Sequence, residues 1–391
     1  MTDYKKNELI ERVEVEINGN FNAAEANDLI QLAHLYFQDS LTEDLVSESI
    51  ENLYGTIICL WDFLQQRPTN QPKIRVYNPN YEEHSWQSTH TVIEILTDDM
   101  PFLVSSFSMA LVRLGHTIHM TAHPVVPAQR NKKGELQSIN PASKSQEALM
   151  RFEIDRLSDI NLLDDIKEEL LKSLVDVNKT VADWPKMKTR LSEIISESEQ
   201  LTHLKGNEEH QEILDFLHWV ANDHFTFIGF RAYDLSIEGN ETHLKLVDGS
   251  GLGTFRDIND KKVKRDIVLH DNLAKLAIDS SNILILTKST AISTVHRPVH
   301  LDYLGIKRFD KTGNVIGEWR FFGLYSSAAY IARLQDIPLL RKKLDVIVQK
   351  ANVDPNSHKG KNLKHILNSY PRDEMLQAPV EELFGTIESI L

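Results

Sequence analysis

Cysteine and long apolar runs are both scarce in this sequence. The 391 residues include a single cysteine, Cys59, which excludes an intramolecular disulfide and any zinc site built on cysteines. Cys59 lies in the apolar stretch 57–61, which predicts a buried, inert thiol. The longest apolar candidate, 56–64, is interrupted by Asp62 and is much shorter than the roughly 20 residues that cross a bilayer. The N-terminus is rich in charge and lacks the apolar core of a signal peptide, so we expect a cytoplasmic protein with no membrane partner.

Positive charge is outweighed by negative charge. Lys and Arg number 43 against 57 Asp and Glu, which gives a formal net charge of −14. A phosphate-binding surface requires the opposite sign, so we expect no nucleic-acid partner. The strongest basic run, residues 261–265, is explained more simply as a solvated turn.

The common signatures of catalytic and nucleotide sites are missing as well. The sequence contains no GxxxxGK[ST] phosphate loop and no GxSxG nucleophile motif. Residues 249–253 have the spacing GxGxG without a helical continuation, which favours a flexible loop over a dinucleotide site. His116, His119 and His123 lie in a strand-like segment, where four residues span about 13 Å, too far for one metal ion. The residues alone therefore predict no catalytic, cofactor or metal site.

The hydrophobic pattern predicts an α+β protein. Residues 1–67 have helical spacing, and a proline-containing linker follows at 67–72. The next strands and helices are predicted at 73–77 (strand), 91–97 (strand), 101–115 (helix), 117–125 (strand), 149–156 (strand) and 158–177 (helix). In 149–156 apolar and charged residues alternate, which predicts a half-buried strand. From residue 91 onward the order is the ferredoxin-like split pattern without its last strand, and 73–77 can fill that place.

A second α+β pattern follows the first. A helix is predicted around 213–220 and again at 272–278, and the strands are predicted at 225–234, 243–247, 282–287, 301–309 and 315–325. The last two strands form a hairpin across residues 310–314, and 282–287 is predicted to be buried. We therefore expect tandem ferredoxin-like units with antiparallel sheets, flanked by helical segments, in four parts: 1–70, 71–205, 206–332 and 333–391. The last apolar helical stripe runs to Leu391, so we expect the natural protein to continue beyond it.

The loop from residue 97 to residue 102 joins a predicted strand to a predicted helix. Asp98 or Asp99 can cap that helix, and Pro101 suits its first turn. Free backbone N–H groups at a helix N-terminus can also bind a carboxylate. Two interpretations stay open here, a plain capped turn and a carboxylate-binding loop.

Residues 91–115, with the strand at 117–125, resemble an ACT domain through their order of strand, acidic loop, proline and helix. ACT domains are small ferredoxin-like modules that commonly bind amino acids at domain interfaces and regulate enzymes. The resemblance implies an amino-acid effector, with Asp98, Asp99 and Pro101 as its contacts. The position that is usually Gly in ACT loops is Phe102 here.

A longer resemblance covers most of the chain. Its main segments are STVHRPVHLDYLGIKRFD (293–310) and GEWRFFGLYSSAAY (317–330). The supporting segments are HFTFIGF (224–230), GSGLG (249–253), RFEID (151–155) and YPRDE (370–374). These runs resemble the N-terminal region of the large NAD-dependent glutamate dehydrogenases. The family-signature surface that they imply consists of His296, Arg297, His300, Asp302 and Arg320.

The resemblance implies a non-catalytic regulatory and assembly region of a longer protein. That protein would convert L-glutamate to 2-oxoglutarate and ammonia, with NAD bound in a downstream catalytic domain and no cofactor in these 391 residues. The implied partners are the downstream domains of the same chain, further copies in a homo-oligomer and an amino-acid effector. Two alternatives remain, a purely structural oligomerisation module and a stand-alone hydrolase that uses the cluster from His296 to Asp302.

Overall fold

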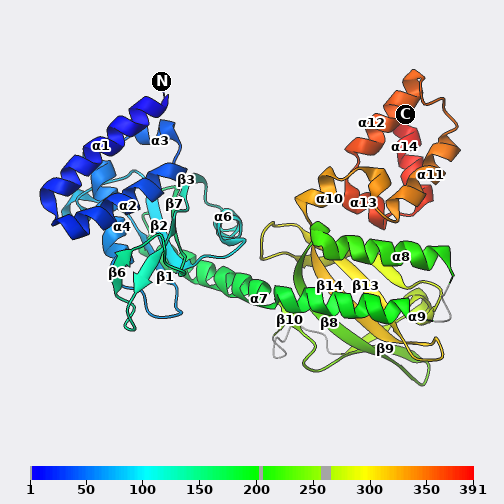
Figure 1. Ribbon diagram of the computed structural model, residues 1–391. Coiled ribbons are helices and arrows are strands. Elements are labelled where there is room, and N and C mark those ends of the chain that lie inside the picture. The colour runs from blue at the N-terminus through cyan, green and yellow to red at the C-terminus, as the bar shows by residue number, and fades with distance from the viewer. Residues whose placement is uncertain (1, 202–205, 257–265) are drawn as a thin grey trace. The chain divides into compact units, whose positions relative to one another are not determined.

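The computed structural model describes residues 2–201, 206–256 and 266–391. The basic run 261–265 lies outside the described residues. The chain divides into two compact units, Met1–Val177 and Asn178–Leu391, and each is described by itself. Figure 1 shows the first in blue to cyan and the second in green to red.

The first unit opens with the predicted helical segment. It consists of α1 (Thr2–Asn20), α2 (Ala23–Asp39), α3 (Thr42–Ser47) and α4 (Ile50–Gln65). Local capping fixes two of the starts, because the side chain of Asn22 accepts hydrogen bonds from the first turn of α2 and Ser49 does the same for α4. The apolar faces of α1, α2 and α4 meet in one core, so these helices are held by packing as well as by their caps.

The sheet of the first unit has the order β1-β2-β7-β3, and every neighbouring pair is antiparallel. Its strands are β1 (Lys73–Tyr77), β2 (Thr91–Asp98), β7 (Glu147–Ile154) and β3 (Ile118–Ala122), and the short β4 (Val125–Val126) also pairs with β7. The helix α6 (Leu103–Arg113) connects β2 to β3. This is the ferredoxin-like order with β1 in the place of the missing last strand, as the sequence predicts. Outside the sheet lie α5 (Tyr81–His84) and the hairpin of β5 (Ala128–Arg130) and β6 (Leu136–Ile139).

The strand β7 differs from the half-buried strand predicted for 149–156. Leu149 packs with the N-terminal helices in one core, and Arg151 is also buried on that face. Met150 and Phe152 are fully buried on the opposite face. Figure 1 shows α1, α2 and α4 on one side of the sheet and α6 on the other, which leaves β7 covered on both faces. The prediction was wrong because alternating charges in a strand do not show whether helices that are distant in the sequence pack against its polar face.

The helix α7 (Ile160–Glu199) is 40 residues long and continues well past the predicted end at Val177. It passes through Pro185 without ending there, and the boundary between the two units falls within it. Met187, Leu191 and Ile194 are fully buried and continue its apolar face into the second unit. Although α7 is long, no helix among the described residues combines the length and the apolar character needed to cross a membrane.

The second unit contains a sheet of order β11-β9-β8-β14-β13-β12, antiparallel throughout. The strands are β8 (Phe225–Glu238), β9 (Glu241–Leu246), β11 (Asp266–Leu269), β12 (Leu284–Ile292), β13 (His300–Phe309) and β14 (Val315–Tyr325), with β10 (Leu252–Gly253) paired to β8. The hairpin β13–β14 confirms the prediction. The second ferredoxin-like unit is not confirmed, because strands that follow one another in sequence are neighbours here, without an intervening strand. The predicted buried strand 282–287 is only partly buried, because β12 is an edge strand in which Leu284, Ile285 and Leu286 have intermediate burial.

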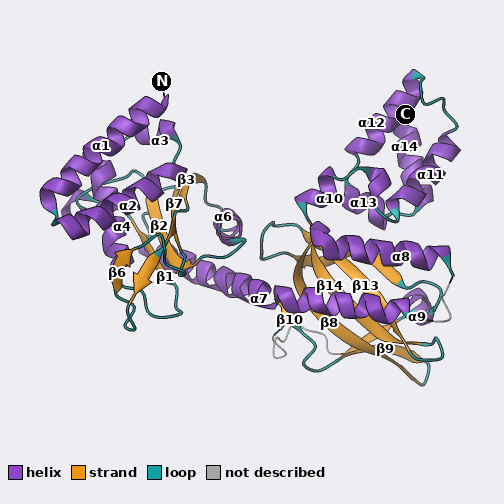
Figure 2. Ribbon diagram, viewed as in Figure 1, coloured by secondary structure: helices purple, strands orange, loops and turns teal. Residues whose placement is uncertain are grey.

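Helices cover one face of this sheet. The helix α8 (Glu208–Trp219) and the C-terminal half of α7 share a core with the strands, and Figure 2 shows both lying across the sheet. A short π-helical turn, Val220–His224, links α8 to β8, and α9 (Asp271–Ile278) precedes β12. The end of the chain is helical, as predicted. It consists of α10 (Ser327–Ile331), the 3-10 turn Leu334–Asp336, α11 (Leu340–Ala351), α12 (His358–Ser369), α13 (Arg372–Gln377) and α14 (Val380–Ile390).

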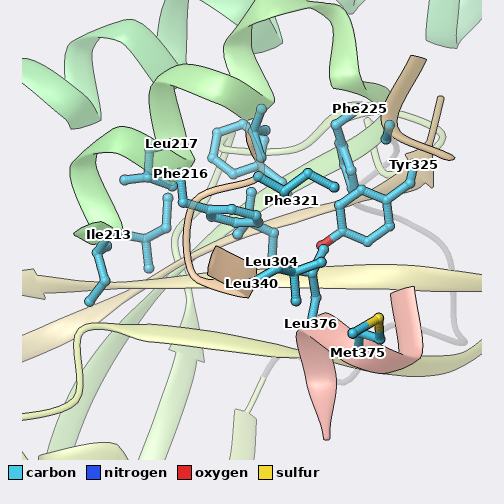
Figure 3. Close-up of a cluster of buried hydrophobic side chains, with 14 of the residues drawn as sticks. Ile213, Phe216, Leu217, Phe225, Leu304, Phe321, Tyr325, Leu340, Met375 and Leu376 are labelled. Carbon is cyan, nitrogen blue, oxygen red and sulfur yellow. The ribbon is translucent and has the colours of Figure 1, made fainter. Parts of the chain in front are cut away.

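The C-terminal helices belong to the same core as the sheet. Figure 3 shows Leu340 and Leu376 beside Leu304 of β13, with Phe216 of α8 close by. Tyr325 packs edge-on against Phe225, with ring centroids 5.4 Å apart. This cluster packs against the C-terminal end of β14 through Tyr325, which pairs with β8 beside the segment that carries Arg297 and Asp302.

Candidate functional site

The predicted effector loop follows β2 in the first unit. Asp98 is largely exposed, and its Oδ1 lies 2.8 Å from Nη1 of the buried Arg67. The same Nη1 lies 3.1 Å from Oε1 of Glu147 on β7. Asp99 donates its backbone N–H to Gln146, and its side chain lies 3.8 Å from Nε2 of His123. Both aspartates therefore contact residues in neighbouring segments that lie just outside the strands.

The start of α6 differs from the predicted capped turn. The helix begins at Leu103, its N-cap is Phe102, and no side chain caps it through a hydrogen bond. Pro101 thus precedes the helix. Phe102 has φ +74°, the left-handed conformation that favours glycine, and its carbonyl accepts a hydrogen bond from Ser106. Phe102 thus adopts a conformation that glycine would adopt more easily, and effector binding through Asp98, Asp99 and Pro101 stays a prediction.

The family-signature residues Arg297 and Asp302 lie at one end of the second sheet. Asp302 is buried and its Oδ1 lies 2.6 Å from Nζ of Lys288 and 3.1 Å from Nε2 of Gln377. Lys288 also contacts Asp373 at 2.7 Å. Burial raises the pKa of Asp302, and the ammonium group of Lys288 only partly offsets this rise. The network joins β12 and β13 to α13.

Arg297 connects this end of the sheet to the next signature segment. Its Nη2 donates to the carbonyl oxygen of Tyr325 at 2.9 Å, and its guanidinium lies over the ring of Tyr330. Segments 293–310, 317–330 and 370–374, which carry the longer resemblance, therefore meet here through Arg297, Asp302, Tyr325, Tyr330 and Asp373. The contacts are ion pairs and hydrogen bonds that fix helices to the sheet.

His300 and Asp302 have different hydrogen-bond and ion-pair partners, and His296 lies in a turn that precedes β13. His296 occupies a tight turn with φ +73°, and burial lowers its pKa. His300 is exposed, and its Nδ1 lies 3.1 Å from the carbonyl oxygen of Ser289. The carboxylate of Asp302 is engaged by Lys288 and Gln377 instead. Within the described ranges, no three His, Cys, Asp or Glu side chains lie close enough to hold a metal ion.

Arg320 lies apart from the other signature residues. It is opposite Gly305 in the β13–β14 ladder, whereas Asp302 is opposite Gly323, so the two side chains are on opposite faces of the sheet. Arg320 donates to Oε2 of Glu318 at 2.9 Å and lies 4.3 Å from the ring centroid of Tyr233. The structure thus splits the predicted surface into two separate clusters.

The glycine-containing segment 249–253 does not fit NAD. A dinucleotide site requires free backbone N–H groups that point at the pyrophosphate and a helix that follows them. The N–H of Gly253 is bonded to Oδ2 of Asp183 at 3.0 Å, and the segment continues into β10 and a turn up to residue 256. A Cβ at Gly251 or Gly253 would lie about 2 Å from a backbone carbonyl oxygen, so these glycines serve close packing.

Known proteins resemble this chain over nearly its whole length. Residues 32–170 match the ACT1 domain of glutamate dehydrogenase, and residues 337–391 match helical motif 1 of glutamate dehydrogenase. The chain is 33% identical over 98% of its length to the NAD-specific glutamate dehydrogenase of Halomonas elongata, and 35% identical over 92% to that of Pseudomonas aeruginosa. The chain belongs to the large NAD-dependent glutamate dehydrogenase family. It corresponds to their N-terminal region and spans 24% and 22% of the lengths of these two relatives.

A more distant relative agrees with this assignment. The NAD-specific glutamate dehydrogenase of Mycobacterium tuberculosis is 23% identical over 76% of the chain, which spans 18% of its length. The ACT1 match covers α4 and the whole first sheet, and the helical motif match covers α11 to α14.

A cavity lies within the residues of the ACT1 match, and it could not be predicted from the sequence. It has a volume of about 180 Å³ and is lined by Tyr36, Glu48, Trp86, Arg151 and Glu153. Its walls come from the N-terminal helices, the segment before β2, and the strands β3 and β7. The only sequence signal was the segment 151–155, which supported the family resemblance but which we expected to place its charges in solvent.

Proposed function

We propose that this chain is a non-catalytic regulatory and assembly region of a large NAD-dependent glutamate dehydrogenase. An amino-acid effector binds the first unit and shifts the activity of a catalytic domain in the longer protein. That domain uses NAD to convert L-glutamate to 2-oxoglutarate and ammonia. A cytoplasmic location is part of the proposal and is supported by the acidic composition.

The observation that carries the proposal is the ACT1 match over residues 32–170. It coincides with an antiparallel sheet whose strands β1, β2, β7 and β3 have the ferredoxin-like order, and with a strand–loop–helix unit whose Phe102 has a left-handed backbone. ACT domains, which this unit resembles, commonly bind amino acids and regulate enzymes. Regulation further requires that the effector binds two states of the protein with different affinities.

Thermal unfolding of the 391-residue chain with each of the twenty amino acids tests the proposal. An amino acid that binds only the folded chain adds about 2.7 kcal/mol to its stability at a hundred times its Kd. For a unit of this size, we expect the melting temperature to rise by several degrees. A flat result at millimolar concentrations, with a clear melting transition, would remove the effector from the proposal.

An assembly role without an effector is the second candidate, and one observation favours it. Leu171 and Val175, one turn apart on α7, are among the exposed large apolar side chains of the first unit. Such a stripe suits contact with another copy of the chain or with a further domain. Light scattering at micromolar concentration tests self-association. A mass of one chain at every concentration would exclude a homo-oligomer formed by this region alone.

A further inference from the structure

We propose that the cavity beside Arg151 is a binding site for a free amino acid, whose α-carboxylate pairs with this arginine. The inference deepens the proposed function and rests on it, since it names where the effector binds. The site differs from the predicted loop at Asp98–Pro101, because none of those loop residues lines the cavity.

Arg151 is buried and incompletely bonded. It is 2% exposed, and its Nη2 donates to Oε1 of Glu153 at 2.5 Å. Among the described residues, its Nε and Nη1 have no hydrogen-bond partner. Leaving buried N–H groups of a charged side chain without partners costs free energy, and a bound carboxylate oxygen would recover it.

The neighbours of Arg151 supply a third free donor. Trp86 is 2% exposed, and within the part of the chain that the structure describes its indole Nε1 also lacks a hydrogen-bond partner. The guanidinium carbon lies 4.6 Å from the ring centroid of Trp86 and 5.9 Å from that of Tyr36. The aromatic rings hold the guanidinium in place, so its N–H groups are oriented before a ligand arrives.

The charges around the cavity favour a zwitterion over a simple anion. Arg151 is already paired with Glu153, whose other oxygen lies 3.1 Å from both Ser88 Oγ and His90 Nδ1. A carboxylate alone would add a negative charge to this balanced pair. An amino acid adds none, because its ammonium group can face the carboxylate of Glu48 on the cavity wall. The volume of about 180 Å³ has room for several non-hydrogen atoms, since one water takes about 30 Å³ of the liquid.

Calorimetric titration of the 391-residue chain with the twenty amino acids, and with L-alaninamide as a probe without a carboxylate, tests the site. Arg151→Lys keeps the positive charge beside Glu153 and removes the unpaired guanidinium donors. We expect its Kd for the amino acid that binds the wild type to rise at least about tenfold, the usual order for a lost bond to a charged group. Arg75→Lys is the matched control. Arg75 lies on β1 of the same sheet, is paired with Glu94 and does not line the cavity, so its Kd should stay within about twofold of the wild type.

The outcomes separate this inference from the proposed function. Loss of binding in Arg151→Lys, with an unchanged melting temperature without ligand and normal binding by Arg75→Lys, supports the site. Equal binding by Arg151→Lys and the wild type, or loss of binding in Asp99→Asn alone, overturns the site and leaves the effector role intact. Binding of L-alaninamide as tight as that of L-alanine overturns the carboxylate contact. No binding of any amino acid to the wild type overturns both the site and the effector role.

Discussion

Glu94 on β2 is fully buried, yet it is well paired. Its Oε2 accepts a hydrogen bond from Nε of Arg75 at 2.9 Å, and its Oε1 accepts one from Tyr77 at 2.9 Å. Burying such an ion pair costs desolvation free energy, but removing one partner leaves the other charge buried without a counter-charge. The first sheet therefore depends on its buried carboxylates as well as on its apolar residues.

Glu94→Ala should lower the free energy of unfolding of the first unit by about 3 kcal/mol, because Arg75 and Tyr77 lose their partner. The exposed Asp98 on the same strand provides the control. Asp98→Ala should cost less than about 1 kcal/mol, since Arg67 keeps Glu147. Urea unfolding followed by circular dichroism measures both. An equal decrease in the free energy of unfolding in both variants would show that burial does not determine how much these ion pairs stabilise the fold.

Phe102 occupies a left-handed conformation that strains any residue with a Cβ. Phe102→Gly and Phe102→Ala both remove the aromatic side chain, and only the first also removes the strain. We expect the glycine variant to be more stable than the alanine variant by about 1 kcal/mol, the reverse of the order inside a helix. Melting temperatures of the two variants measure the difference. If alanine proves equal or better, the loop does not hold this conformation in solution.

At the scale of elements, α7 holds the loop that follows β9 in place. Asp183 is completely buried, and it accepts hydrogen bonds from Nε of Arg256 at 2.7 Å and from the N–H of Gly253 at 3.0 Å. Burial alone would raise the pKa of Asp183, but the hydrogen bonds from Arg256 and Gly253 outweigh it and lower the pKa to about 2. One side chain in the middle of the helix thus fixes the glycine segment.

Asp183→Asn should therefore destabilise the second unit by about 2 kcal/mol at pH 7. Because the pKa is lowered on folding, the stabilisation is complete above the unfolded pKa near 3.8 and is lost as the pH falls to about 2. The gap in unfolding free energy between wild type and variant should shrink over that window. Lys186→Ala, which removes only an exposed partner of Asp183, should change little. A gap that stays constant from pH 5 to pH 2 would contradict the ionised role of Asp183.

Elements with a strong local pattern could be predicted from the sequence. The strand 73–77 and the hairpin around 310–314 follow from alternation and turn residues, and both are confirmed. The length of α7 could not be predicted from the sequence, because a proline such as Pro185 usually ends or kinks a helix. Here the burial of Met187 and Leu191 in the core of the second unit stabilises the helix beyond the proline. The strand order of the second sheet was also predicted wrongly. The spacing of apolar residues shows where strands lie in the sequence but not which strands pair with one another.

At the scale of the whole chain, the candidate site shows the same limit. The charges of residues 151–155 indicate a solvent-facing strand, but segments distant in sequence, including Tyr36 of α2 and Trp86, pack against Arg151, which is buried. The family could be identified from long runs such as 293–310, which does not require knowing where each side chain lies. The runs did not reveal that Arg297 and Asp302 fix helices to the sheet, while Arg320 lies on its other face.

The claim that this chain regulates a glutamate dehydrogenase has a direct test in a longer protein that carries it. Glutamate-dependent NADH formation should be measured with and without the amino acid that raises the melting temperature of the 391-residue chain. The account predicts a change in rate that saturates over the same concentration range in which the amino acid binds the chain. The reason is that binding shifts the equilibrium between two conformational states of the protein. A rate that stays the same while the amino acid is bound would contradict the regulatory role.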